Sequence, residues 1–150
     1  MIKRAEARGK VLPLKWVFVY KLNETGDLAK CKARICARGD LQEANFESTY
    51  AVTLAVRAFR TTMAIAARFD LEICQLDVVT AFLNGKIYPH KPVFVELPNG
   101  ARILGMVAQL NRALYGLKDS PLLWYKEFSS TLEELGLQKS REEPCLFTND

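Results

Sequence analysis

The sequence has few of the residues that define metal-binding or disulfide-linked proteins. It contains one histidine and four cysteines in 150 residues, and the cysteine spacing fits no zinc pattern. We therefore expect reduced thiols rather than a disulfide framework. No apolar run approaches the roughly 20 residues of a membrane span, and no signal-peptide stretch follows the basic start MIKRAEARGK. These absences predict an intracellular chain that is neither secreted nor attached to a membrane.

Composition is ordinary for one globular domain, but charge is unevenly placed. Hydrophobic residues make up 49% and charged residues 25% of the chain, and the net charge is +4. Residues 1–40 hold ten Lys or Arg and four Asp or Glu, whereas the other 110 residues have a net charge of −2. This asymmetry favours a polyanionic partner for the first part of the chain, with a merely solvated basic face as the alternative.

A β-hairpin is predicted near the start. The stretch WVFVYKL at 16–22 is rich in β-branched and aromatic residues, the turn cluster NETGD follows, and LAKCKARICA at 28–37 forms the second strand. Alternation along that strand places Lys32, Arg34, Cys36 and Arg38 on one face. Its three cations lie about 7 Å apart, a spacing that suits a phosphate chain. Charges that protect a strand edge from aggregation are the alternative.

Two helices are predicted. In residues 56–69, Phe59, Met63 and Ala66 or Ala67 recur at helical spacing. Ser120 as N-cap and Pro121 at the first helical position begin the second helix, which Gly136 ends. Its expected buried stripe consists of Trp124, Phe128, Leu132 and Leu135. Trp16 is also assigned to the core.

Residues 71–78 are predicted to form a central strand, because apolar side chains fall on both of its faces. Asp77, near its end, has no basic residue within four positions. A buried unpaired charge is costly, so Asp77 either faces water at the lip of the strand or holds a cation. Further strands are expected at 93–97, 106–110 and from Cys145, which together give an α+β fold with one antiparallel sheet and helices on one side.

A cationic strand, an acid at a strand end and a glycine-containing loop before a helix are the parts that nucleotidyl transfer needs. The triphosphate attracts cations, and Mg²⁺ prefers hard oxygen ligands. One carboxylate is too few for a two-metal site, so a second acid is expected from elsewhere.

Three stretches of the sequence resemble the reverse transcriptase domain of Ty1/copia-type retrotransposons. They are KWVFVYKLNETGDLAKCKARICARGDLQ, QLDVVTAFLNG and LNRALYGLKDSPLLWY, and the similarity runs from about Lys10 to Phe147. RGDLQ and SPLLWY most resemble fungal copies. The resemblance implies the fingers and part of the palm of a right-hand polymerase, with about 14–54 as fingers hairpin and loop and about 55–150 as mixed palm and fingers.

The resemblance also implies roles for matching residues. Asp77 corresponds to the first catalytic aspartate, a ligand of Mg²⁺ or Mn²⁺. Phe82 corresponds to the aromatic steric gate that favours deoxynucleotides, with a core residue as the alternative. The other residues implied to bind nucleotide are Lys32, Arg34, Val78, Thr80, Ala81, Tyr115 and Gly116. Template or primer contacts are implied for Lys118 and Arg38, and for Arg38 solvated surface is the alternative.

Implied partners are a dNTP, an RNA or DNA template with its primer, and the RNase H and integrase portions of the polyprotein. The implied location is cytoplasmic, in a virus-like particle, or nuclear. Departures are also evident: the family's Tyr-x-Asp-Asp hairpin, thumb and RNase H are missing, and basic residues replace acidic ones around Pro89-His90-Lys91. We therefore expect a piece truncated at both ends and inactive by itself.

Other functions remain open from the residues alone. One alternative is a decayed retroelement fragment that only binds nucleic acid weakly, and another is a remnant with an incomplete fold. A generic acid–base enzyme built around Asp77 has little support, because no histidine or second acid lies near it in sequence.

Overall fold

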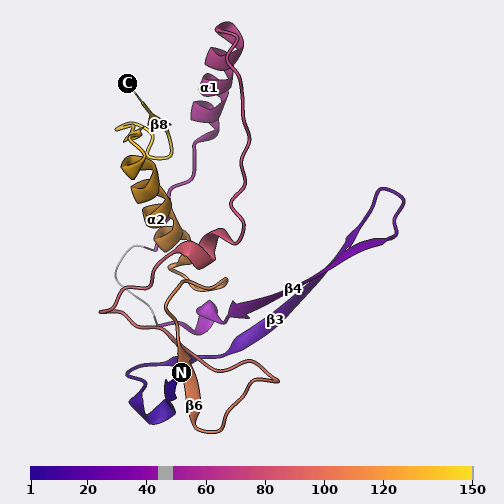
Figure 1. The fold of residues 1–150 in the computed structure, drawn as a ribbon, viewed down its shortest axis with the longest axis vertical. Helices are drawn as coiled ribbons and strands as arrows, with labels where there is room; N and C mark the ends of the chain where they lie inside the picture. Colours follow the sequence, from indigo (N-terminus) through magenta and orange to yellow (C-terminus); the bar gives the residue numbers. More distant parts are fainter. Residues whose placement is uncertain (44–48, 150) are drawn as a thin grey trace.

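The computed structural model describes residues 1–43 and 49–149 as a small core from which a long hairpin projects, with one of its two helices standing apart from that core (Figure 1). The helices are α1 (Val56–Arg68) and α2 (Ser120–Glu134), with 3₁₀ turns η1 (Arg4–Glu6), η2 (Gly39–Leu41) and η3 (Ala81–Asn84). The strands are β1 (Ile2–Lys3), β2 (Val11–Leu12), β3 (Leu14–Leu22), β4 (Leu28–Ala37), β5 (Phe94–Val95), β6 (Met106–Gln109), β7 (Gln138–Lys139) and β8 (Phe147–Thr148).

These strands form three separate sheets. A four-stranded sheet has the order β1-β6-β5-β2, and β3-β4 and β7-β8 are two-stranded. The β2–β5 pair is parallel, and every other pair is antiparallel. The mixed helix and strand content agrees with the predicted α+β class. The prediction of one antiparallel sheet with helices on one side is wrong, since the strand expected at its centre does not form.

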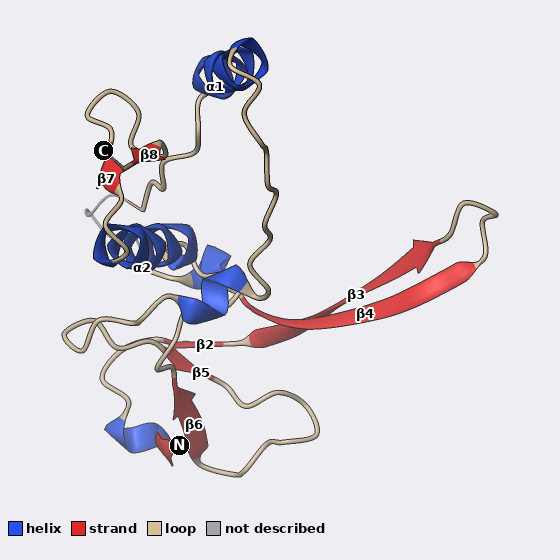
Figure 2. Ribbon diagram, turned by 45° about the horizontal axis from the view of Figure 1, so that its top comes forward, coloured by secondary structure: helices blue, strands red, loops and turns tan. Residues whose placement is uncertain are grey.

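The predicted hairpin is confirmed, and its second strand has the predicted bounds. Strands β3 and β4 pair from Leu14 opposite Ala37 to Leu22 opposite Leu28, with an irregularity at Lys21/Leu22. The turn is closed by the Asn23 Oδ1 atom, which accepts backbone N–H groups of Thr25 at 3.1 Å and Asp27 at 2.8 Å. Beyond its base the hairpin extends away from the rest of the molecule (Figure 2).

The small core lies where the hairpin base meets the four-stranded sheet. Leu12, Ala37, Val95 and Leu117 are buried together there. The core assignment of Trp16 is wrong, because this residue of the hairpin is 43% exposed.

Two glycines hold the hairpin base against the loop that precedes α2. A Cβ atom on Gly116 would collide with the carbonyl oxygen of Ala37, and a Cβ on Gly39 would collide with the carbonyl oxygen of Gly116. The Ala37 N–H donates to the Tyr115 carbonyl at 2.7 Å across the same contact. Only glycine permits backbones to approach this closely.

Both predicted helices are present, but their buried faces differ from prediction. Helix α1 buries Ala66, while Phe59 is 51% exposed. Helix α2 buries Ser120, Leu123 and Ser129 rather than the predicted stripe, of which Leu135 is 73% exposed. Trp124 and Phe128 stack on each other at 5.0 Å, although Phe128 remains partly exposed and is therefore not a core residue.

The start of α2 also differs in detail. Asp119 occupies the N-cap position and Ser120 is the first helical residue, so Pro121 is in the first turn but one position later than predicted. The Ser120 hydroxyl does not cap the helix, because it donates instead to the Leu114 carbonyl at 2.6 Å. Gly136 ends the helix with φ 89°, as expected for a left-handed C-terminal residue.

The strand predicted at 71–78 is wrong. This segment is extended but unpaired, and all of its residues are exposed, with Leu76 at 92%. No strand of the described ranges lies beside it to satisfy its backbone groups, so apolar composition alone does not make it a strand. The four cysteines are free thiols, as predicted, and no helix in the described part of the chain is long and apolar enough to cross a membrane.

Gly116 and Gly26 provide a matched test of the glycine contact. Their φ angles are 90° and 87°, but a Cβ on Gly26 meets nothing within 4 Å. We expect Gly26→Ala to lower the free energy of unfolding by about 1–2 kcal/mol from backbone strain alone. Gly116→Ala should lower it by about 1–3 kcal/mol more, because Ala37 must move. Urea unfolding followed by circular dichroism measures both, and equal losses would contradict the contact.

The thiols should differ in reactivity. Burial, and then the negative charge of Glu143, raise the pKa of Cys145, whose thiol lies 3.4 Å from the Val52 carbonyl oxygen. Cys31 and Cys74 are exposed. Because the thiolate is the reactive form, iodoacetamide at pH 8 should modify Cys145 more slowly than the other two, as followed by peptide mass spectrometry. Faster modification of Cys145 would contradict the burial.

Candidate functional site

Side chains from three distant segments meet at the base of the hairpin. The guanidinium of Arg34, on β4, lies 5.8 Å from the centre of the Tyr115 ring. Tyr115, in the loop before α2, makes an edge contact with Phe82 of η3 at 5.3 Å between ring centres. Since the adjacent Gly116 fixes this loop against β4, the contact is held by backbone as well as by side chains. Arg34, Phe82, Tyr115 and Gly116 were all predicted nucleotide-binding residues.

One face of the hairpin carries a row of cations. Lys21 stands opposite Lys30, Lys32 follows opposite Val19, and Arg34 stands opposite Val17. The pKa of Lys32 is lowered from its usual value, first by the charge of Lys21, then by partial burial, and then by Lys30 and Arg34. This crowding of like charge is relieved when an anion binds, so the cationic face is suited to a phosphate-bearing ligand.

The opposite face of the hairpin is aromatic, a feature that the sequence reasoning missed. Trp16, Phe18 and Tyr20 alternate along β3, and the rings of Trp16 and Phe18 are stacked at 6.0 Å. Phe18 is 66% exposed and Tyr20 70% exposed. The period-two spacing of aromatic residues in WVFVY was the available signal. The hairpin therefore presents cations on one face and rings on the other.

Asp77 lies in the exposed segment that leads into η3. Its neighbour Val78 is also exposed, and Thr80 turns the chain with φ 53°, a left-handed conformation that is unusual for a β-branched residue. The Thr80 carbonyl accepts the Leu83 N–H at 2.8 Å, and Ala81 begins η3. The turn at Thr80 therefore begins three residues after Asp77, and Phe82 follows Asp77 by five residues.

A metal site is incomplete in this part of the chain. Among the described residues, no three His, Cys, Asp or Glu side chains are grouped so that they could hold an ion. Asp77 offers one carboxylate, whereas a two-metal centre needs several hard oxygen ligands. The residues described here therefore do not fit a complete Mg²⁺ or Mn²⁺ site.

The two residues predicted to contact template or primer are engaged within the protein. Arg38 forms an ion pair with Asp40 at 2.6 Å, which lowers the pKa of that carboxyl and raises the pKa of the guanidinium. The Lys118 ammonium group donates a hydrogen bond to the Gln42 backbone carbonyl at 2.8 Å, and the Lys118 backbone N–H donates one to the Gln42 side-chain carbonyl. Both residues help to position η2 beside the loop before α2.

Comparison with known proteins gives consistent matches. The family model described as "Reverse transcriptase (RNA-dependent DNA polymerase)" matches residues 2–150. The retrovirus-related Pol polyprotein from transposon TNT 1-94 of Nicotiana tabacum is 37% identical over 142 residues, covering 90% of this chain and 10% of the relative. The Pol polyprotein from transposon RE1 of Arabidopsis thaliana is 31% identical over 146 residues, covering 91% and 10%.

A yeast relative extends the range of similar proteins. The truncated transposon Ty1-A Gag-Pol polyprotein of Saccharomyces cerevisiae is 31% identical over 121 residues, covering 79% of this chain and 10% of the relative. The chain thus spans about a tenth of the length of these curated relatives. No solved structure matches significantly.

The matched family model spans nearly the whole chain, and the relatives are Pol polyproteins of Ty1 and similar transposons. The chain belongs to the reverse transcriptase (RNA-dependent DNA polymerase) family, as a domain fragment of the Ty1/copia type found in retrotransposon Pol polyproteins.

Proposed function

We propose that this chain supplies the nucleotide-binding part of an RNA-directed DNA polymerase. The contact from Arg34 through Tyr115 to Phe82 carries the proposal, because it joins a phosphate-binding cation to two rings that could border a nucleotide. Residues 14–54 would act as fingers, and residues 55–150 as mixed fingers and palm. The partners would be a dNTP, a primed RNA or DNA template and the rest of a Pol polyprotein.

Each proposed role follows from position and chemistry. Lys32 and Arg34 would neutralise the β- and γ-phosphates from the cationic face of the hairpin. Backbone amides of Val78, Thr80 and Ala81 would lie along the triphosphate, at the turn that the left-handed Thr80 creates. Phe82 would fill the volume that a ribose 2′-hydroxyl needs, which selects deoxynucleotides. Its edge contact with Tyr115 would hold the ring in that position.

Asp77 would serve as one metal ligand of the complete polymerase. Bound Mg²⁺ or Mn²⁺ would supply charge stabilisation for transfer of the nucleotide to a primer 3′-hydroxyl. Because no three His, Cys, Asp or Glu side chains of the described residues are grouped to hold an ion, these residues do not form that centre by themselves. The proposed consequence is that the 150-residue chain lacks polymerase activity.

This inactivity is directly testable. We expect no primer extension by the chain on a primed homopolymer template with either Mg²⁺ or Mn²⁺, since one carboxylate cannot hold two metal ions. Extended products resolved on a denaturing gel are the readout. Clear extension that disappears in Asp77→Ala would contradict the prediction and place a complete catalytic centre in this chain.

A second candidate is a weak nucleic-acid-binding module, and the cationic face of the projecting hairpin favours it. Lys21, Lys30, Lys32 and Arg34 crowd this face, and no ion pair to them is found among residues 1–43 and 49–149. Such a surface binds phosphates without sequence preference and releases counterions. This function requires neither Asp77 nor a metal.

Salt dependence separates the two functions. For labelled oligo(dT), the logarithm of the affinity decreases linearly with the logarithm of the KCl concentration. The magnitude of this slope should be smaller by about 1.4 in Lys32→Ala with Arg34→Ala, because each phosphate contact contributes about 0.7 to it. Arg57→Ala with Arg60→Ala on α1 removes the same charge and should leave the slope unchanged, as should Asp77→Ala. Fluorescence anisotropy measures all of these. An equal fall in the α1 variant would show that only net charge matters.

A further inference from the structure

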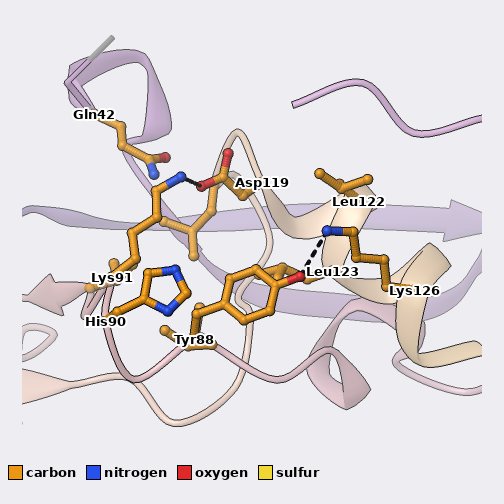
Figure 3. Close-up of a pocket in the computed structure, with 11 residues that line it drawn as sticks. Gln42, Tyr88, His90, Lys91, Asp119, Leu122, Leu123 and Lys126 are labelled. Carbon is orange, nitrogen blue, oxygen red and sulfur yellow. Dashed lines mark hydrogen bonds and ion pairs between the residues drawn. The ribbon is translucent and has the colours of Figure 1, made fainter. Parts of the chain in front are cut away.

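A cavity of about 380 Å³ lies between η2, the 86–93 loop and the first turns of α2, and it contains none of the residues proposed to bind the dNTP (Figure 3). Its volume falls within the roughly 300–1,000 Å³ typical of small-molecule sites. The floor is apolar, with Leu117 and Leu123 buried and Leu122 and Val93 half-buried. Polar side chains occupy the rim.

One wall of the cavity is a pair of stacked rings. The rings of Tyr88 and His90 lie 5.3 Å apart with an interplanar angle of 16°, and both line the cavity. His90 is exposed, so an incoming flat ring can reach this wall. Apolar floor and stacked wall together suit a planar aromatic group.

The charges on the rim differ in how they are compensated. Lys91 pairs with the Asp119 carboxylate at 3.1 Å, so this acid is already occupied by a cation. Lys126 donates to the Tyr88 hydroxyl at 3.0 Å and sits 5.3 Å from the ring centre, and no described carboxylate pairs with it. The adjacent Glu127 instead pairs with Lys86 at 2.8 Å. An anion beside Lys126 would supply the missing partner.

We propose that this cavity binds a small aromatic anion of the nucleoside monophosphate class. The base lies on the apolar floor against the Tyr88 and His90 rings, and the phosphate accepts from Lys126. A metal cation is a poor occupant, because the one carboxylate that lines the cavity is paired with Lys91. A purely apolar ligand would leave Lys126 without a counterion. The site is separate from the proposed triphosphate site and does not depend on it.

The sequence offers a clean reporter, because His90 is the single histidine of the chain. Its imidazole resonances in a proton NMR spectrum of the 150-residue chain should shift saturably as AMP is added. Adenosine lacks the anion and inorganic phosphate lacks the ring. Each should bind with an affinity at least about tenfold lower than that of AMP.

Lys126→Gln should weaken AMP binding by about tenfold, because it removes a charge-assisted hydrogen bond. Lys139→Gln is the matched control, since Lys139 sits 5.4 Å from the Tyr125 ring centre but pairs with Glu133. It should bind AMP as the unaltered chain does, and so should Lys32→Ala with Arg34→Ala. No saturable His90 shift, or equal affinity in Lys126→Gln, would overturn the proposal. Loss of AMP binding in the Lys32 and Arg34 variant would also overturn it, by placing AMP at the triphosphate site.

Discussion

The candidate dNTP site depends on one backbone contact, between the end of β4 and the Tyr115-Gly116 turn. The Ala37 N–H bonds to the Tyr115 carbonyl, while Gly39 and Gly116 leave no room for a Cβ atom on either side. Arg34 lies three residues before Ala37, so its distance from Tyr115 is set by the same contact. Beyond its base the charged hairpin extends away from the rest of the described residues (Figure 2), and this contact places its Arg34 beside the turn that carries Phe82.

Sequence reasoning succeeded where structure is local. The hairpin, α1 and the end of α2 at Gly136 follow from alternation, helical periodicity and turn chemistry within a few residues. It failed where burial depends on a distant neighbour. Residues 71–78 have the composition of a central strand, yet no described strand pairs with them, and Trp16 remains 43% exposed. Composition indicates what a segment can bury, and only the surroundings decide whether it does.

The same distinction applies to the site. Motif matching identified Arg34, Phe82 and Tyr115 separately, and their proximity could not be read from segments some fifty and thirty residues apart. The aromatic face of β3 was visible as alternation but went unnoticed beside its charges. The cavity at Tyr88 and Lys126 could not have been predicted, because only the placed neighbours show that no described carboxylate pairs with the Lys126 ammonium group.

The exposed segment before η3 has a consequence for handling the protein. Between Phe69 and Val79, no described strand pairs with the backbone and large apolar side chains face water, with Leu71, Ile73 and Leu76 among the most exposed. An extended run of this kind can add to the strand edge of a neighbouring molecule. Asp70, Glu72 and Asp77 are the three charges within it that oppose such stacking. Neutralising any of these acids therefore lowers solubility and favours self-association. Asp77, the carboxylate proposed for catalysis, also protects this segment against aggregation.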